Sequence, residues 1–180
     1  MNSLYDMLPE RTQDTLIPYF AKLPDADRVE WICSDMWRPF KKSFRLYLPN
    51  AKLVIDKFHV VRMASVALDT ERKNLQSGMS RYARLNMKKH LRWLLLKRPN
   101  FLTEEQLEVL AQLEKLHPEL KEAYDFKEQF YNIYEATTKN DAIQRFNDWE
   151  RDIPKNIKSF RDVAKTVNNN FEDIFAYWDA

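Results

Sequence analysis

The sequence contains a single glycine, Gly78, among its 180 residues. Hairpin-rich sheets use glycine in their turns, where the backbone adopts conformations that other residues disfavour. One glycine therefore favours a mostly helical chain. It also excludes a glycine-rich phosphate-binding loop and a glycine-based dinucleotide-binding motif.

Cysteine is equally scarce, since Cys33 is the only one. This excludes an internal disulfide and a cysteine-based zinc site. Because Cys33 lies in an apolar run, we expect a buried, unreactive thiol. The sequence has no run of about 18 apolar residues and no basic-then-apolar signal segment at its start. We therefore expect a cytoplasmic protein without a membrane partner.

Acidic residues are rare in the middle of the chain. Between Trp37 and Pro99 there are 16 Lys/Arg and 3 Asp/Glu residues, whereas the flanks hold the other 13 Lys/Arg and 24 Asp/Glu. The net charge of the whole chain is only +2. Such a division predicts one face that binds a polyanion such as DNA and another face that is only exposed to solvent.

Two short β-branched and aromatic segments, residues 29–34 and 51–55, are typical of strands. Between them, residues 36–46 predict a helix with Pro39 in its first turn. A crossover of about 15 residues predicts parallel strands. Functional groups gather beyond the carboxyl ends of parallel strands, and the residues that follow the two strands are Asp35 and Asp56.

The rest of the chain predicts helices. Residues 10–23 favour a short helix that Pro18 kinks or breaks. Further helices are expected over residues 60–75, 80–96, 118–134 and 157–167, with one capped by Thr103 and one capped by Asn140 and extending to residue 153. The predicted fold is α/β turning mostly α, with domains at residues 1–57 and 58–180.

Apolar residues in two of these helices predict faces that pack into a core. The helix over residues 80–96 carries apolar residues against a basic face: Tyr82, Leu85, Leu91, Leu94 and Leu95. The helix capped by Thr103 has a predicted buried stripe of four leucines: Leu107, Leu110, Leu113 and Leu116.

Asp35 is the first candidate for chemistry. A carboxylate at the mouth of a parallel sheet suits a hard cation such as Mg²⁺, which takes oxygen ligands and often only one or two carboxylates. Two such ions can align a phosphodiester for in-line attack. The alternative is that Asp35 caps the helix that follows it, because Asp is a favoured N-cap.

Asp56 and His59 form the second candidate. At this spacing the two side chains can meet across the first turn of a helix, and a carboxylate–imidazole hydrogen bond would orient the ring. The alternative is an Asp56 helix cap next to a partly buried histidine. No nucleophile accompanies the pair.

Basic side chains supply the third candidate, because Lys and Arg neutralise phosphates without regard to sequence. Trp93 or Tyr82 could stack on an unpaired base. The alternative is a solvated helix face that happens to be basic. The predicted DNA-binding residues are Lys41, Lys42, Arg62, Arg81, Arg84, Lys88, Lys89 and Arg92.

These features together resemble insertion-sequence transposases of the ISL3 type (the IS204/IS1001/IS1096/IS1165 group). The shared pattern is Asp35 followed by Met and an aromatic residue, a basic amphipathic helix, Pro-Asn-Ala, an apolar strand and Asp-x-Phe-His-Val. The match is strongest over residues 29–73. It continues through the helical remainder, including Trp149 and residues 174–178.

The resemblance implies a ribonuclease-H-like core with an all-helical insertion after its fifth strand. Residues 29–34 and 51–55 would be the fourth and fifth strands. Asp35 would be the second catalytic aspartate and a ligand of Mg²⁺ or Mn²⁺. Asp56 and His59 would be the family's Asp-x-x-His motif, a structural or DNA-contacting support.

The family's first aspartate and its final glutamate, in Asn-Gly-x-x-Glu, have no counterpart in this sequence. We therefore expect an internal fragment of a DDE transposase that binds no metal tightly, neither cuts nor joins DNA by itself, and retains DNA binding. A partial sheet would leave an apolar face that favours aggregation, a homo-oligomer or repacked helices. The alternative function is a non-catalytic helical interaction or regulatory module.

Overall fold

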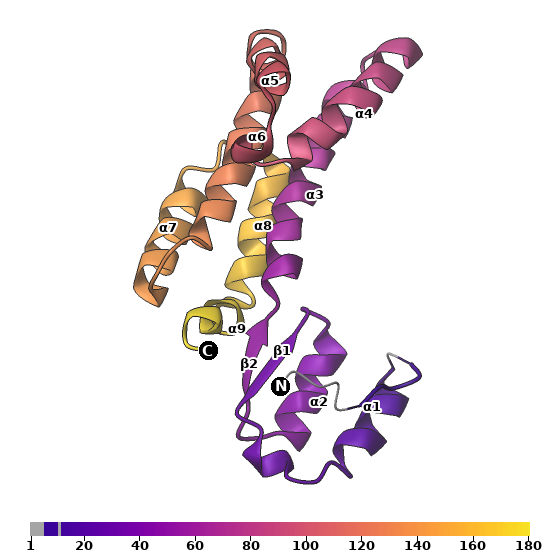
Figure 1. Ribbon diagram of the computed structural model, residues 1–180, viewed down its shortest axis with the longest axis vertical. Coiled ribbons are helices and arrows are strands. Elements are labelled where there is room, and N and C mark those ends of the chain that lie inside the picture. The colour runs from indigo at the N-terminus through magenta and orange to yellow at the C-terminus, as the bar shows by residue number, and fades with distance from the viewer. Residues whose placement is uncertain (1–5, 11) are drawn as a thin grey trace. The chain divides into compact units, whose positions relative to one another are not determined.

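The computed structural model describes residues 6–10 and 12–180, except the side chains of residues 83 and 86–90. It is mostly helical with a small two-stranded parallel sheet, as the sequence predicts at this level (Figure 1). The elements are α1 (Gln13–Phe20), η1 (Ala26–Arg28), β1 (Trp31–Ser34), α2 (Arg38–Tyr47), β2 (Lys52–Ile55), α3 (Lys57–Gln76), α4 (Arg81–Leu96), η2 (Pro99–Phe101), α5 (Glu104–Leu116), α6 (Pro118–Ile133), α7 (Lys139–Arg151), α8 (Lys158–Asn168), α9 (Phe171–Phe175) and η3 (Ala176–Trp178).

The chain packs as two compact units. The first, the strand unit, comprises Met1–His59 together with Glu172–Ala180, and the second, the helical unit, comprises Val60–Phe171. The sequence predicts a boundary between residues 57 and 58 and does not predict that the last nine residues return to the strand unit. Within the described part of the chain, no helix has the length and apolar character needed to cross a membrane.

The two strands of the strand unit are parallel and in register from Trp31 opposite Lys52 to Ser34 opposite Ile55. The amide of Asp56 extends the ladder by donating to the carbonyl of Ser34 at 2.8 Å. The apolar residues of β2 are buried, and β2 packs against η3 of the returning segment. Both aspartates therefore follow the carboxyl ends of paired strands.

Cys33 is exposed, so the predicted buried thiol is wrong. Among the described residues β1 pairs on one edge only, with β2. The same holds for β2 in this two-stranded sheet, but β2 also packs against η3, and Val54, the partner of Cys33, is buried. The pKa of the Cys33 thiol is still raised, first by partial desolvation and then by the charge of Asp56.

Helices α1 and α2 pack together through aromatic rings. Thr12 caps α1 by accepting from the amide of Thr15, and Pro18 lies inside this eight-residue helix. Phe20 meets Phe44 edge to face at 5.4 Å, and Phe40 stacks on Phe44 at 5.7 Å. Helix α2 starts at Arg38 with proline in its first turn, where an N–H is not needed.

The returning segment is tied to α2 by an ion pair. The ammonium of Lys41 donates to the Asp173 carboxylate at 2.6 Å, and both side chains are largely covered, with 13% and 15% of their surface exposed. Arg45 lies 3.8 Å from the same carboxylate but is largely exposed. Asp173 stands next to buried Ile174 and Phe175. The segment is therefore held by both apolar burial and a shielded charge pair.

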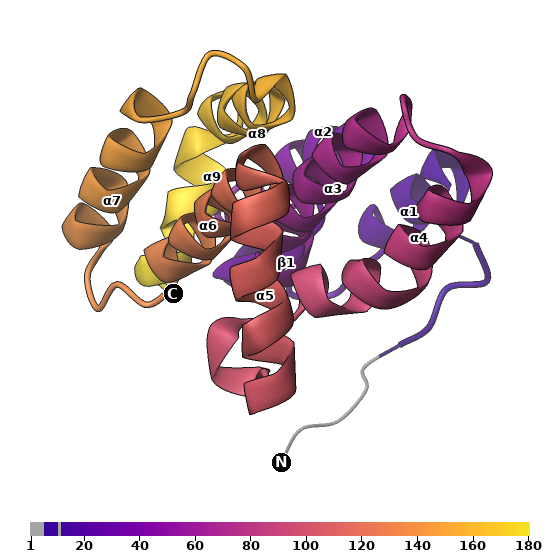
Figure 2. The ribbon, with the colours of Figure 1, turned by 90° about the horizontal axis from the view of Figure 1, so that it is seen from above.

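The core of the helical unit is aromatic. Viewed from above, α6 lies between α5 and α7 (Figure 2), consistent with its contacts to both. Trp149 of α7 is buried and its indole N–H donates to the carbonyl of Phe126 at 3.0 Å. Its ring lies 4.8 Å from that of Phe130 and 6.2 Å from that of Phe160.

The predicted capping box at Thr103 is confirmed, because Thr103 and Gln106 each accept from the other's amide. The predicted cap at Asn140 is wrong. Helix α7 begins at Lys139, and Thr138 accepts from the amide of Asp141 instead. Thr and Asn are both favoured caps, so composition alone does not choose between neighbouring positions.

A buried lysine holds the end of α4 against α6. The side chain of Lys127 is fully covered, and its ammonium donates to the carbonyls of Leu95 at 2.8 Å and Lys97 at 3.2 Å. It also pairs with the Glu128 carboxylate at 2.6 Å. Nearby, Arg98 donates to Glu128 and Asn132. Desolvation lowers the pKa of Lys127.

Two of the predicted core-facing stripes are only partly covered. In α4, Leu94 and Leu95 are buried, but Tyr82 and Leu85 are exposed. In α5, Leu110 and Leu113 are buried, but Leu107 and Leu116 are exposed, Leu116 with 73% of its surface. The two helices diverge from their junction (Figure 1), so the helical unit covers only part of each.

Candidate catalytic carboxylates and nucleic-acid surface

Asp35 directly follows β1 and is half-buried. One of its carboxylate oxygens accepts from the amide of Trp37 at 3.0 Å. Trp37, not Asp35, is the N-cap of α2, and it makes no side-chain capping bond. The Asp35 carboxylate therefore fixes the turn between β1 and α2. Because the backbone amide of Trp37 holds this carboxylate, the carboxylate keeps a defined direction at the carboxyl end of β1.

Asp56 occupies the equivalent position after β2. Its carboxylate accepts from the amide of Phe58 at 2.8 Å, which is the capping interaction that the alternative interpretation requires. The imidazole Nε2 of His59 lies 3.9 Å from the other carboxylate oxygen, and both side chains are more than a third exposed. This separation is too long for a hydrogen bond. It allows a charge interaction when His59 is protonated.

The two aspartates occupy neighbouring strand ends because Ser34 and Ile55, the residues before them, are opposite each other in the ladder. One or two carboxylates suffice for Mg²⁺, which keeps several waters as ligands. In the described part of the chain, no three His, Cys, Asp or Glu side chains gather closely enough to hold a metal together. The donor set suits a weakly held hard cation.

The predicted DNA-binding residues fall into both units. In the strand unit Lys42 is exposed, whereas Lys41 is paired with Asp173. In the helical unit Arg62, Arg81, Arg84 and Arg92 are exposed. The guanidinium of Arg92 lies 5.8 Å from the ring of Trp93. The predicted residues Lys88 and Lys89 belong to α4, but their side chains lie outside the described residues.

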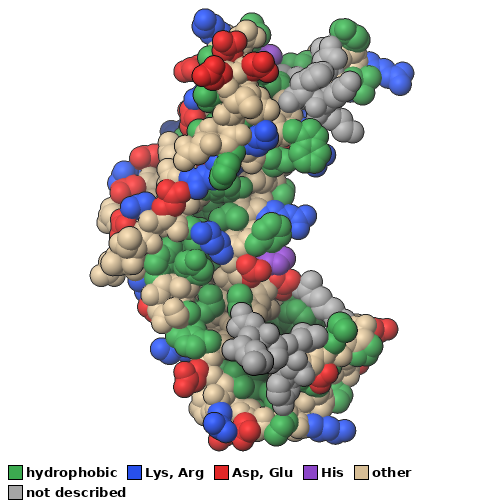
Figure 3. Space-filling model, viewed as in Figure 1, with side chains coloured by type: hydrophobic (Ala, Val, Ile, Leu, Met, Phe, Trp, Pro, Cys, Tyr) green, Lys and Arg blue, Asp and Glu red, His purple; other side chains and the backbone are tan. Residues whose placement is uncertain are grey.

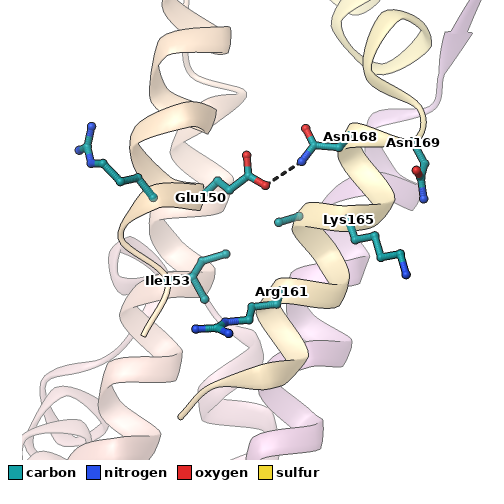
Figure 4. Close-up of a pocket in the computed structure, with 8 residues that line it drawn as sticks. Glu150, Ile153, Arg161, Lys165, Asn168 and Asn169 are labelled. Carbon is teal, nitrogen blue, oxygen red and sulfur yellow. Dashed lines mark hydrogen bonds between the residues drawn. The ribbon is translucent and has the colours of Figure 1, made fainter. Parts of the chain in front are cut away.

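A pocket of about 440 Å³ lies between the end of α7 and α8 (Figure 4). Glu150 points towards α8 and accepts from the amide of Asn168 at 2.7 Å. Arg161 points towards Ile153, and Lys165 also belongs to the lining. Charges of both signs therefore border this pocket, and they give it no clear preference for an anionic or a cationic ligand.

The sequence interpretation did not include Asp173 or Lys127. Asp173 had a detectable signal, because it is an acid inside the apolar run that ends the chain. Lys127 had none, since it is one of several charged residues in α6 and only the packing of that helix shows that it is buried.

Comparisons with known proteins agree with these features. The family model of ISL3-type DDE transposases matches residues 1–180. The transposase for insertion sequence element IS1001 of Bordetella parapertussis is 27% identical over 174 residues, 93% of this chain and 43% of the relative. The transposase for IS1557 of Mycobacterium tuberculosis is 30% identical over 148 residues, 69% of this chain and 32% of the relative.

The chain thus spans less than half the length of these relatives. No solved structure matches it significantly. The resemblance inferred from the sequence is confirmed by the family match. Because that match extends over all 180 residues, the chain belongs to the ISL3 family of DDE transposases.

Proposed function

We propose that this chain is a central part of the catalytic region of an ISL3 transposase and that Asp35 is one of its catalytic carboxylates. The observation that carries the proposal is the pair of parallel strands in register, each followed by an aspartate. In this proposal β1 and β2 are the fourth and fifth strands of a ribonuclease-H-like core. Val60–Phe171 is then the helical insertion that interrupts it.

Asp35 is the residue that would hold Mg²⁺ or Mn²⁺, and Asp56 with His59 supports the same strand ends. In a complete transposase the ion would polarise a phosphodiester bond and stabilise the charge that develops on it. The contribution of this chain is to aim Asp35, through the bond from the amide of Trp37. The chain supplies two neighbouring carboxylates of the proposed site, and we expect that it neither cuts nor joins DNA by itself.

Millimolar Mn²⁺ is expected to broaden the amide signals of residues 34–37 and 56–59 in NMR spectra of the chain, because a paramagnetic ion relaxes nearby nuclei. Weak affinity is expected, since one or two carboxylates at a partly solvated site bind a divalent ion loosely. In Asp35→Asn the broadening should fall at least severalfold. The matched control is Asp27→Asn, at an exposed acid in η1, which should leave the effect unchanged. Equal broadening in the parent and Asp35→Asn would remove Asp35 from the proposed site.

The second part of the proposal is sequence-independent DNA binding by exposed arginines of α3 and α4. Phosphate contacts release counterions, so the logarithm of the binding constant should fall linearly with the logarithm of the salt concentration. For Arg81→Ala/Arg84→Ala/Arg92→Ala the slope should shrink by up to about 0.9 for each phosphate that is no longer neutralised. Fluorescence anisotropy with a labelled duplex of arbitrary sequence measures both the affinity and its salt dependence.

The matched control removes three other exposed positive charges from the helical unit: Lys115, Lys155 and Lys158. This triple alanine variant has the same net charge as the arginine variant. If the two variants bind DNA with equally reduced affinity, net charge alone explains the binding and the arginines are not a specific surface. Affinity that does not respond to salt would contradict DNA binding by phosphate contacts.

A further inference from the structure

Phe58, two residues after Asp56, presents its ring to solvent. The residue is 63% exposed, although the chain buries apolar residues on either side of it. Ile55, the last residue of β2, is fully covered, and Val60 in the first turn of α3 is 1% exposed. These two buried side chains anchor the turn between them. The exposed ring therefore belongs to a well-packed turn and has a defined place in it.

Backbone bonds hold this turn against the end of β2. The amide of Phe58 donates to the Asp56 carboxylate at 2.8 Å, and the amide of His59 donates to the Asp56 carbonyl at 3.0 Å. The rings of Phe58 and His59 meet edge to face with their centres 5.7 Å apart. Figure 3 shows hydrophobic and acidic side chains next to a histidine at the start of α3. An exposed aromatic surface therefore adjoins the Asp56 carboxylate.

The other side of the same turn is taken by the returning segment. The ammonium of Lys57 lies 5.8 Å from the centre of the Tyr177 ring, and that ring packs edge to face on Trp178 at 5.0 Å. Consecutive residues of a helix point about 100° apart, because a turn contains 3.6 residues. The segment that covers Lys57 therefore leaves the side of Phe58 open.

A single exposed phenylalanine is common on protein surfaces and carries no function by itself. Its position distinguishes Phe58 from Phe101, which is also exposed, at 73%. Phe101 lies in η2, the short connection between α4 and α5. Phe58 instead lies next to the strand end that carries Asp56, and Asp35 follows the neighbouring strand.

The chemistry of this surface selects its ligand. A phenyl ring has a flat apolar face, and each nucleobase presents a similar face whatever its sequence. A base inside a duplex is already paired and stacked on its neighbours, so only an unpaired base has a face to offer. The adjacent Asp56 carboxylate repels anions, but it does not repel the uncharged face of a base.

We propose that Phe58 stacks on an unpaired base of a DNA strand held at the ends of β1 and β2. The proposal rests on the proposed function, because it takes DNA as the ligand and the strand ends as the place of binding. Stacking adds a contact that carries no charge and depends on the base. It makes the chain bind a strand with unpaired bases more tightly than the same phosphates without bases, and it holds that strand beside Asp35 and Asp56.

The test compares two labelled duplexes that differ only in a short 3′ overhang, which consists of adenines in one and of abasic sites in the other. The number of phosphates is the same, so phosphate contacts contribute equally to both. Fluorescence anisotropy should show that the parent chain binds the adenine overhang at least about fivefold more tightly, the lower limit for one stacked base. In Phe58→Ala the two affinities should become equal, while their salt dependence stays as in the parent.

Three further variants separate stacking from apolar contact in general. Phe58→Tyr keeps a ring and should keep the preference for adenines, whereas Phe58→Leu keeps an apolar side chain and should lose it. Phe101→Ala is the matched control, because it removes an equally exposed phenylalanine away from the strand ends, and it should bind both overhangs like the parent. NMR signals of the Phe58 ring should shift with the adenine overhang and not with the abasic one.

The possible failures are distinguishable. Equal affinity of the parent chain for the two overhangs, with the usual salt dependence, would overturn stacking by Phe58 and leave DNA binding in place. A preference for adenines that persists in Phe58→Ala would overturn it too, and would assign the stacking to another exposed ring such as Trp93. Absence of binding to both duplexes at low salt would contradict the DNA binding in the proposed function and this inference with it.

Discussion

Lys127→Met is expected to destabilise the helical unit by about 3–5 kcal/mol, the usual effect of removing one partner from a buried ion pair. Methionine matches the length of the lysine stem but removes the ammonium partner of the Glu128 carboxylate, which keeps only the Arg98 guanidinium at 3.2 Å. It also leaves the Leu95 carbonyl without the donor that lies 2.8 Å away. Urea unfolding followed by circular dichroism, with hydrogen exchange of the α6 amides, measures the change in stability.

Lys121→Met is the matched control on the same helix. Lys121 pairs with Asp125 at 2.7 Å, but the Asp125 side chain is nearly half exposed. Such pairs contribute about 0–1 kcal/mol, so this variant should unfold almost like the parent. Equal destabilisation in the two variants would show that the buried ion pair of Lys127 contributes no more to stability than an exposed one. Lys127→Met/Glu128→Gln should recover part of the stability, because the side chain that lost its ammonium partner is then uncharged and Arg98 keeps its pair with Glu135.

The difference in unfolding free energy between the parent chain and Lys127→Met should change with pH in a defined direction. The pKa of Lys127 is lowered in the folded chain from its ordinary value of 10.5, so in the range between the two values the unfolded chain binds more protons. The stability of the parent should therefore rise with pH in that range, and Lys127→Met should lack the rise. The gap between parent and variant then widens with pH. The range should be kept below 10, the ordinary pKa of Tyr124, because burial raises the pKa of that phenol.

Lys41→Met is expected to loosen the returning segment Glu172–Ala180. The Asp173 carboxylate is largely covered and loses its partner at 2.6 Å, while Arg45 at 3.8 Å offsets part of the effect. A local destabilisation of about 2–3 kcal/mol corresponds to roughly 30–150-fold faster amide exchange in this segment. Hydrogen exchange resolved by residue, with α1 as an internal reference, measures it.

Lys42→Met provides the matched control, since Lys42 is the exposed neighbour on α2. In Lys42→Met the amide protons of Glu172–Ala180 should exchange at the parental rate. The reversed pair Lys41→Asp/Asp173→Lys should restore protection in part, because attraction between the two positions is regained. If Lys41→Met left the exchange of Glu172–Ala180 unchanged, apolar burial of Ile174 and Phe175 alone would hold the segment.

This ion pair bears on the proposed function. A helical insertion is compatible with a catalytic core only if the chain returns to that core after it. The segment that starts at Glu172 returns to the strand unit, which contains the proposed core strands, and η3 packs against β2, the strand that Asp56 follows. In this chain the Lys41 ammonium pairs with the Asp173 carboxylate, and DNA binding by Lys41 stays a prediction.

Local signals in the sequence predicted much of the fold. The strand–helix–strand order, the parallel pairing and the capping box at Thr103 depend on short-range patterns, and the structure has all three. The exposure of Cys33 was not predictable in this way. An apolar residue in a strand is buried only if something covers its face, and coverage depends on segments far away in the sequence.

By itself, the sequence determined the order of the elements, the positions of Asp35 and Asp56 at strand ends and the transposase family, because periodicity and motifs are carried by neighbouring residues. Only the tertiary structure decided which charges are buried and which apolar stripes are left uncovered. Lys41 and Lys127 look like other surface lysines in the sequence, yet each is enclosed by residues from a distant segment. Leu116 continues a leucine stripe that no part of the described chain fully covers. Burial is a property of long-range packing, which local periodicity does not encode.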